Sequence, residues 1–454
     1  MDQTFMKEKK VMPLVLSMSY PMAISMAVNA LYNIVDSFFV AKMSSSAMTA
    51  LSLLFPVQNF VHAAAVGFGI GINAVVAFYM GAGKTDEADR AASSGTVLSI
   101  LHGLVLMVVC IAVMPWFMSM FSSDAQTIEY GIAYTGVLFL FAPMDCTAMA
   151  LEKIFQSTGR MKSTMFCLAT GCIINIILDP LMIFGIGPFP EMGIRGAALA
   201  TGIGQTLPVL IYFIMYRKDP LPVKLSIKHW RPRFYMMKKL YSVGNAATLN
   251  IALPSVQVSV LNGILASYSA GYVFVLGVFY KLQTFLYLSA NGVVQGIRPL
   301  VGYNYGAGEH GRVKSIVRTS TVLVAAIMVM GTVVCLLMAE QLMGIYTGDV
   351  KLIALGAPAL RIISAGFIVS SVAVVLSGAL EGLSKGNASL VISLIRYIVF
   401  ILPAAFILSR MMGAAGVWHA FWITEIVAAF ISYFVYRKAT RQDAGQASAV
   451  QTEI

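Results

Sequence analysis

Two aspartates lie within long apolar stretches of this sequence, where ionisable side chains are costly and mark a functional site by default. Asp36 occurs in NALYNIVDSFFVAK, and Asp179 occurs in CIINIILDPLMIFG, one helical turn after Asn175. Pro180 follows Asp179 and loosens the backbone beside its carboxylate. With the hydroxyl of Thr201, these side chains would form an oxygen-lined pocket for a small cation, and carboxylates can also exchange protons. We therefore predict a cation- or proton-coupling site; the alternative is a polar cluster that only fixes helix packing.

A second group of ionisable residues falls in other apolar stretches. Its members are Asp145, Glu152, Lys281, Arg396 and Glu425. Asp145 and Glu152 are seven residues apart and share one helix face, where they could form part of a proton route or a cytoplasmic gate. Glu425 could pair with Arg396 or with Lys281. Structural ion pairs without a role in transport would explain the same residues equally well.

The overall composition excludes a soluble protein. Only 11% of the 454 residues are charged, 58% are hydrophobic, and the mean hydropathy is +0.81, whereas a soluble domain carries about a quarter charged residues. The chain is therefore expected to be an integral membrane protein. Its five cysteines lie in apolar stretches as free thiols, and no histidines have the spacing of a metal site. Since no His, Asp and Glu cluster gathers near one interface, we expect neither an enzyme nor a cofactor.

Turn signals divide the chain into twelve apolar segments that can each cross a bilayer, which takes about 20 residues. We expect an all-α fold with helices near 13–41, 50–80, 94–120, 127–157, 164–187, 192–216, 240–268, 272–303, 314–339, 353–383, 388–409 and 413–436. Several segments exceed the minimum length, so tilted, kinked or protruding helices are expected. The Gly-rich run at 196–204 predicts close helix packing rather than a phosphate loop.

The net charge of +11 follows the loops between these segments. Most of the 31 Lys and Arg residues lie near the two termini and in the loops after even-numbered helices, above all in 217–239. By the positive-inside rule, both termini and this loop are cytoplasmic. The charge therefore reports membrane topology, and no nucleic-acid partner is expected.

The sequence also repeats itself after about half its length. Gly-Ala-Gly occurs at 81–83 and again at 306–308, an offset of 225 residues, and the Ala-Leu-Glu that ends in Glu152 recurs with Glu381. A duplicated, apolar chain is typical of a secondary transporter.

Each half of the repeat holds six predicted helices. Because six is even, both halves enter the membrane in the same orientation, and a pseudo-two-fold axis along the membrane normal should relate them. We predict an N-terminal bundle at 1–216, a basic linker at 217–239, a C-terminal bundle at 240–436 and a disordered polar cytoplasmic tail at 437–454.

Twelve helices, the half-chain repeat with its basic linker, the Gly-Ala-Gly turns and NIILDP in helix five resemble the multidrug and toxic compound extrusion (MATE) family over about residues 13–436. The sequence is most similar to bacterial members, including multidrug exporters of Gram-positive bacteria. The resemblance implies a cation or proton site in the N-terminal bundle, at Asp36, Asn175, Asp179 and Thr201. Some members carry an acidic residue in helix seven, but NAATLNIALPSVQVSVLNGILAS has none. Coupling is therefore expected in the N-terminal bundle.

The resemblance implies an antiporter, driven by H+ or Na+, that exports amphipathic and often cationic drugs by alternating access between the bundles. Its partners would be small-molecule drugs or organic cations and the lipid bilayer. We expect a monomer that crosses the bacterial cytoplasmic (inner) membrane several times. The alternative within the same superfamily is a flippase for lipid-linked precursors, which should have a more cationic cavity and additional helices. A channel would fit less well, since the repeat predicts alternating access rather than a fixed pore.

Overall fold

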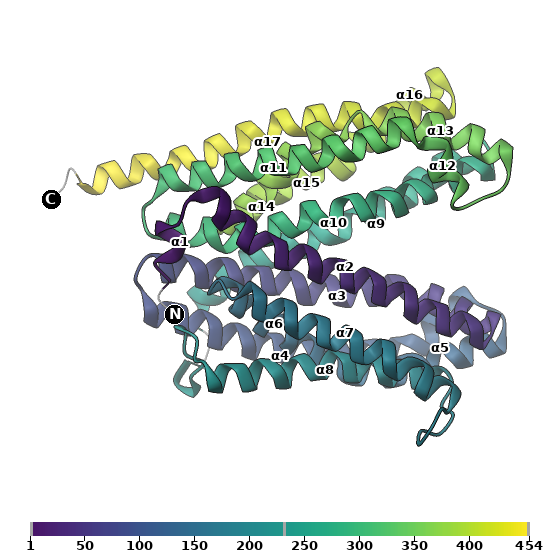
Figure 1. Ribbon diagram of the computed structural model, residues 1–454, viewed down its shortest axis with the longest axis horizontal. Helices are drawn as coiled ribbons and strands as arrows, with labels where there is room; N and C mark the ends of the chain where they lie inside the picture. Colours follow the sequence, from purple (N-terminus) through teal and green to yellow (C-terminus); the bar gives the residue numbers. More distant parts are fainter. Residues whose placement is uncertain (1–2, 230–232, 452–454) are drawn as a thin grey trace.

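The computed structural model describes residues 3–229 and 233–451, and all regular structure within them is helical (Figure 1). The first half contains α1 (Phe5–Glu8), α2 (Val11–Met43), α3 (Ser45–Gly81), α4 (Thr85–Phe121), α5 (Ala125–Leu138), η1 (Phe139–Phe141), α6 (Ala142–Ser157), α7 (Met161–Phe184) and α8 (Ile194–Lys218). After η2 (Ile227–His229), the second half contains α9 (Phe234–Ala266), α10 (Ala270–Gly306), α11 (His310–Leu337), α12 (Ala339–Gly344), α13 (Val350–Ser364), α14 (Phe367–Gly382), α15 (Gly386–Leu394), η3 (Ile395–Val399), α16 (Ile401–Met412) and α17 (Ala414–Gln451). The predicted all-α class is confirmed.

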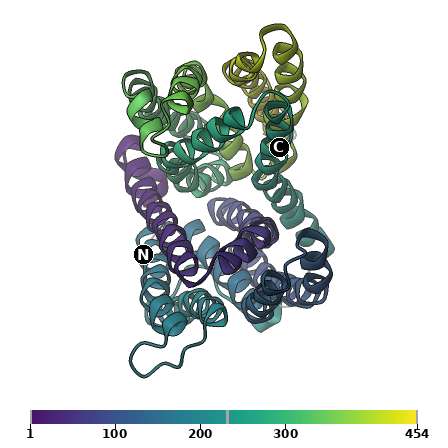
Figure 2. The same ribbon diagram turned by 90° about the vertical axis from the view of Figure 1, so that its right-hand side faces the viewer.

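Within the described residues, eleven helices are long and apolar enough to cross a membrane. The number is twelve when α13 and α14, which meet at an angle of 54°, count as one bent span. These spans lie where the sequence predicts them. Figure 2 looks along the helices and shows that the first six and the last six gather into two separate bundles. The predicted architecture of two six-helix bundles is confirmed.

The fourth and tenth spans are interrupted at equivalent places. η1 separates α5 from α6 at residues 139–141, and α13 gives way to α14 at residues 365–366. Adding the 225-residue offset of the repeat to 139–141 gives 364–366. The two bundles therefore repeat an irregular feature as well as the number of helices.

The two Gly-Ala-Gly copies form the same turn at the end of α3 and of α10. Gly83 and Gly308 have φ angles of +70° and +76°, a left-handed conformation that glycine adopts without steric strain. In both turns the next residue donates its amide to the carbonyl five residues earlier at 2.9 Å. The last glycine of the motif therefore ends the helix.

The first glycine of each copy lies where the two bundles cross. A Cβ atom on Gly81 would lie 1.8 Å from the carbonyl oxygen of Tyr303, and one on Gly306 would lie 2.0 Å from that of Phe78. The repeat relates these two contacts to each other, since both residues of each pair are 225 apart from their counterparts. The motif thus permits a backbone-to-backbone crossing of α3 and α10 that a larger residue would prevent.

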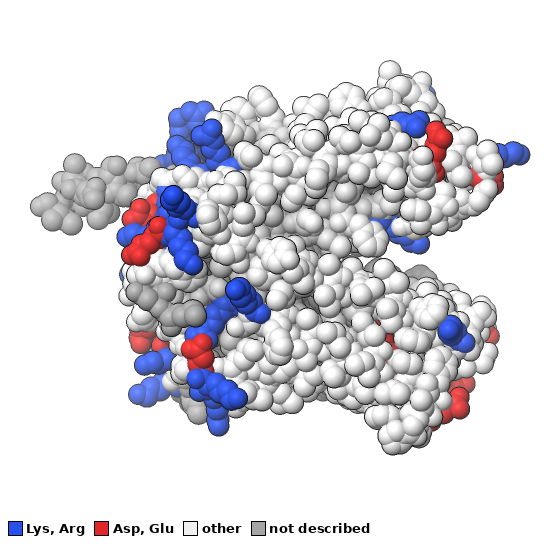
Figure 3. All heavy atoms as spheres, viewed as in Figure 1, with Lys and Arg blue, Asp and Glu red and all other residues white. Residues whose placement is uncertain are grey.

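The bundles meet mainly through α2 and α3 on one side and α9 and α10 on the other. Glycines again allow close approach, because a Cβ on Gly71 would lie 2.5 Å from the carbonyl oxygen of Leu240. These contacts lie toward the end that carries both termini, where most Lys and Arg side chains gather (Figures 1 and 3); we call it the basic end. At the opposite, open end, a cleft separates the two halves (Figure 3).

The segment before α2 bridges the two bundles at the basic end. Gln3 Nε2 donates to the carbonyl oxygen of Thr158, in the turn between α6 and α7, at 3.1 Å. The carbonyl oxygen of Met6 accepts hydrogen bonds from Asn304 and Arg312 of the second bundle, both at 3.1 Å. The Met6 side chain is fully buried. This segment therefore acts as a strap across the closed end.

The connection between the bundles and the C-terminal region differ from the sequence prediction. α8 continues to Lys218 and α9 begins at Phe234, so the non-helical connection is shorter than the predicted linker 217–239. The expectation of a disordered tail is not met, because α17 continues through 437–451; residues 452–454 lie outside the described part. Polarity suggested disorder there, but Ala, Arg and Gln, which are frequent in this stretch, also favour helix.

Candidate coupling site

Three helices of the first bundle bring the predicted coupling residues together. Asp36 lies on α2, Asn175 and Asp179 lie on α7, and Thr201 lies on α8. All four side chains are buried, and Asp179 is 0% exposed. Asn175 Nδ2 donates to Thr201 Oγ1 at 3.3 Å, and the Asp36 and Asp179 carboxyl groups are close enough to interact directly. The four residues grouped from the sequence therefore form one cluster.

Glycines position α7 against α8 at this cluster. A Cβ on Gly171 would lie 2.6 Å from the carbonyl oxygen of Gly204, and one on Gly204 would lie 3.0 Å from that of Gly171. The two backbones can approach this closely because neither position carries a side chain. The approach brings Asn175 within reach of Thr201 and confirms the close-packing interpretation of the Gly-rich run 196–204.

Several buried oxygens of the cluster have no hydrogen-bond donor among the described residues. They are Oδ1 of Asp36, Oδ1 of Asn175 and both carboxylate oxygens of Asp179. Leaving one buried acceptor unsatisfied costs about 1–3 kcal/mol, and more when it is charged. Two carboxyl groups can hydrogen-bond each other only when one of them carries a proton. The arrangement can therefore bind a proton, or a small cation of the kind that prefers oxygen ligands.

Two tyrosines that the sequence analysis missed complete the surroundings. Tyr32 on α2 and Tyr134 on α5 both lie near Asp36 and within hydrogen-bonding reach of Thr201. Tyr32 precedes Asp36 by one helical turn, a spacing that could have identified it. Tyr134 lies on a helix for which the sequence gave no functional signal.

The comparison with protein families is consistent with this duplicated architecture. The MatE family model matches residues 21–181 and again residues 247–407, once in each bundle. The chain belongs to the MatE family. It is accordingly a multi-pass membrane transporter and not an enzyme.

Relatives of this MatE protein extend along its whole length. The multidrug export protein MepA of Staphylococcus haemolyticus (strain JCSC1435) is 25% identical, over 99% of this chain and 98% of its own. The "Crystal structure of MATE in the bent conformation" superposes with a TM-score of 0.91 at 22% identity, over 99% of both chains. The "Outward-facing conformation of a multidrug resistance MATE family transporter of the MOP superfamily" has a TM-score of 0.89 at 22% identity, over 97% of this chain and 98% of that one. The solved structures share the fold.

Elsewhere in this MatE protein, Glu152 belongs to a cluster that joins the two bundles. Its carboxylate pairs with Lys153 at 2.7 Å, and Lys153 Nζ also donates to Gln295 Oε1 on α10 at 3.4 Å. The cluster thus combines the two sequence interpretations, since it is an ion pair that also contacts the opposite bundle. Asp145 lies on the same helix, nearer the open end, and is buried close to His62.

In the second bundle, Glu425 pairs with Arg396 rather than with Lys281. Arg396 Nη2 lies 2.7 Å from Glu425 Oε1 and also donates to the hydroxyl of Tyr287 at 3.2 Å. Arg396 lies in the π-helical turn η3, a feature that is frequent at functional sites. The pair balances two charges inside the bundle, as the sequence analysis considered.

We predict that Arg396→Met lowers the free energy of unfolding by about 3–5 kcal/mol, because it leaves Glu425 without its partner in a buried site. The double variant Arg396→Met/Glu425→Gln should regain most of this stability, since it removes the unpaired charge. Thermal unfolding of the detergent-purified protein measures both effects. Arg410→Met, at an exposed position near the open end, serves as the control. Equal stability of the single and double variants would contradict the prediction.

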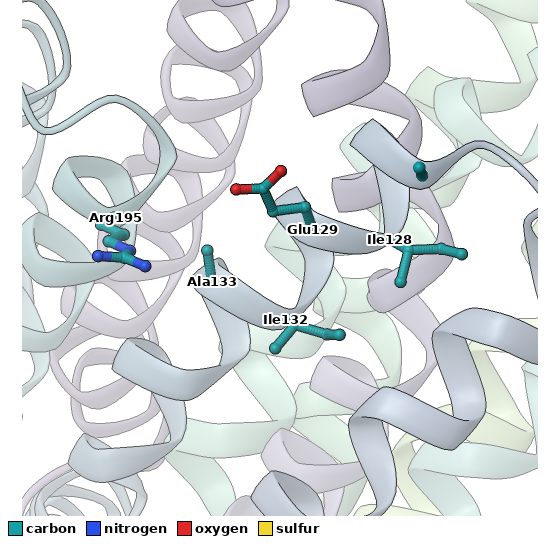
Figure 4. Close-up of a pocket in the computed structure, with 6 residues that line it drawn as sticks. Ile128, Glu129, Ile132, Ala133 and Arg195 are labelled. Atoms are coloured by element: carbon teal, nitrogen blue, oxygen red, sulfur yellow. The ribbon is translucent and has the colours of Figure 1, made fainter.

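A surface pocket of about 440 Å³ lies near the open end, between the start of α5 and the start of α8. Figure 4 shows Glu129 and Arg195 on different sides of it, with Ile128, Ile132 and Ala133 between and beside them. None of the predicted site residues lines it. The pocket is therefore separate from the coupling cluster of this MatE protein.

Proposed function

We propose that this MatE protein exports amphipathic, often cationic drugs in exchange for H+ or Na+, by alternating access between its two bundles. The observation that carries the proposed coupling is the set of buried, donor-free oxygens on Asp36, Asn175 and Asp179. The relative named as a multidrug export protein supports the substrate class. The positive-inside rule supports a cytoplasmic basic end, so that the cleft opens outward.

In this proposal the outward-open protein takes the ion from outside into the cluster on α2, α7 and α8. Ion and drug must stabilise different conformations, or compete for one, because a ligand shifts an equilibrium only through its differential affinity for the two states. Binding at α2 and α7 would change the packing of the first bundle beside the cleft. Drug release to the outside would then be favoured.

Return to the cytoplasm-facing state requires the contacts at the basic end to break. They include the glycine crossing of α3 and α10, the Lys153–Gln295 hydrogen bond and the N-terminal strap described above. His102 Nε2 on α4 also lies 2.7 Å from the Tyr241 hydroxyl on α9. Each contact joins the two bundles only at the closed end. They are therefore the interactions that the proposed inversion must exchange.

The proposal predicts that wild-type protein in proteoliposomes transports a fluorescent organic cation when a gradient of the coupling ion is imposed. A Na+ gradient and a pH gradient are applied in separate experiments, with the membrane potential clamped by K+ and valinomycin. The gradient that drives transport names the ion, and vesicles without protein are the control. Absence of transport under both gradients would overturn the proposed antiport.

A further inference from the structure

Lys281 is a positive charge within a membrane-spanning helix that no carboxylate neutralises among the described residues. Other basic side chains within spans hold a carboxylate at 2.7 Å: Lys153 with Glu152, Arg298 with Glu381 and Arg396 with Glu425. Lys281 Nζ instead lies 5.6 Å from the centre of the Tyr346 ring. An unpaired ammonium group is costly within a bilayer, and such groups usually face a water-filled cavity or a substrate pathway.

The spacing along α10 places Lys281 on the helix face that points toward the first bundle. Gly292 and Gln295 follow it by 11 and 14 residues, which is close to three and four helical turns. A Cβ on Gly292 would lie 2.7 Å from Cα of Ala23 on α2. Gln295 accepts the hydrogen bond from Lys153 described above. All three positions therefore belong to one stripe of α10 that faces the first bundle.

At the level of Lys281, this stripe no longer packs against the first bundle. With a rise of 1.5 Å per residue, Lys281 lies about 16 Å beyond Gly292 in the direction of the open end. Its side chain is exposed, and Phe285, one turn away on the same stripe, is 53% exposed. Figure 3 shows the two halves separated by a cleft at this end. Lys281 and Phe285 therefore belong to the cleft wall.

The two bundles present opposite charges around the cleft. In the first bundle the ionisable groups that lack a basic partner are acidic, namely Asp36, Asp145 and Asp179. In the second bundle the unpaired group is the ammonium of Lys281. Charges act over longer distances in low-dielectric surroundings than in water. The arrangement favours a substrate with one cationic and one anionic group, each nearer the bundle of opposite sign.

We propose that Lys281 binds the anionic group of substrates, such as a carboxylate or a sulfonate, so that the transporter exports zwitterionic amphiphiles as well as simple cations. The inference rests on the proposed export function and specifies its substrate class. An ammonium donor forms short, strong hydrogen bonds to anionic oxygens, and Phe285 supplies apolar surface for the body of the substrate. A simple cation gains nothing from Lys281 and is repelled by it.

The test compares two substrates that differ in one group, a rhodamine with a free carboxylate and its methyl ester. Both are offered to wild-type protein and to Lys281→Met and Lys281→Arg in proteoliposomes. We expect Lys281→Met to lower transport of the free acid by roughly tenfold or more, as for the loss of a charged hydrogen bond, and to leave the ester unchanged or faster. Lys281→Arg should retain transport of the acid. Lys351→Met, an exposed lysine of the same bundle near the open end, is the control.

Each other outcome decides against the inference. Equal losses for acid and ester in Lys281→Met would assign the residue a structural role. Unchanged transport of the acid would show that it does not bind the anionic group. Wild-type protein that moves the ester but not the acid would overturn this inference alone. Wild-type protein that moves neither would overturn the proposed export function as well.

Discussion

Asp179→Asn is expected to abolish gradient-driven efflux while the protein remains folded. Asn keeps the shape of the side chain but carries no charge and cannot exchange a proton, so the ion no longer distinguishes two states of the first bundle. A coupling free energy between two sites is typically about 1–3 kcal/mol, so its loss should slow transport by roughly 5- to 150-fold. Asp36→Asn should act in the same direction, because its carboxyl group faces that of Asp179.

The measurement is efflux of a fluorescent cation from proteoliposomes under the gradient that drives the wild type. Glu191→Gln removes an exposed carboxylate in the loop between α7 and α8 and serves as the matched control. Thermal unfolding checks that Asp179→Asn remains folded; it should be at least as stable as the wild type, since a buried charge is removed. If both aspartate variants couple as well as the wild type, the cluster is not the coupling site.

The sequence could identify this cluster because the cost of burying charge does not depend on the details of packing. Asp36 and Asp179 were conspicuous within apolar stretches, and helical spacing connected Asn175 to Asp179. Tyr134 could not be found in this way, since a tyrosine in a span is ordinary and its position beside Asp36 depends on how α5 packs. The spacing of Tyr32 and Asp36 was available in the sequence and could have been used.

Ion pairs within the spans were predicted less completely than the cluster. The sequence left Glu425 with two possible partners, Arg396 and Lys281. Helical spacing shows which residues share a face of one helix, but pairing between α15 to α17 and α10 depends on how the helices rotate and tilt against each other. The structure selects Arg396 and leaves Lys281 on the cleft wall. That one choice is the basis of the substrate class inferred above.

The repeated Gly-Ala-Gly was visible in the sequence, whereas the separate tasks of its two glycines required three-dimensional structure. The last glycine of each copy adopts a left-handed turn, which a sequence reader can anticipate. The first glycine contacts the backbone of the other bundle, a relation between distant segments that local patterns do not contain. The second large effect is therefore expected at the first glycine.

Gly81→Ala should shift the transporter away from the state that is closed at the basic end. The added Cβ would lie 1.8 Å from the carbonyl oxygen of Tyr303, so the crossing backbones must separate. Overpacking of this kind typically costs about 1–3 kcal/mol, which corresponds to roughly 5- to 150-fold in the ratio of the two states. Gly306→Ala should have the same effect, because the repeat relates its contact with Phe78 to that of Gly81. Efflux should fall in both variants, since transport requires both states.

Spin labels at Lys162 and Lys314, which are exposed on opposite bundles near the basic end, report this shift directly. Their distance distribution should gain a longer component in Gly81→Ala and in Gly306→Ala. Gly311→Ala is the matched control, because a Cβ at this nearby position meets no atom within 4 Å. Unchanged distances together with wild-type efflux in Gly81→Ala would mean that the bundles tolerate a side chain at the crossing. The paired glycines would then not be what holds the basic end closed.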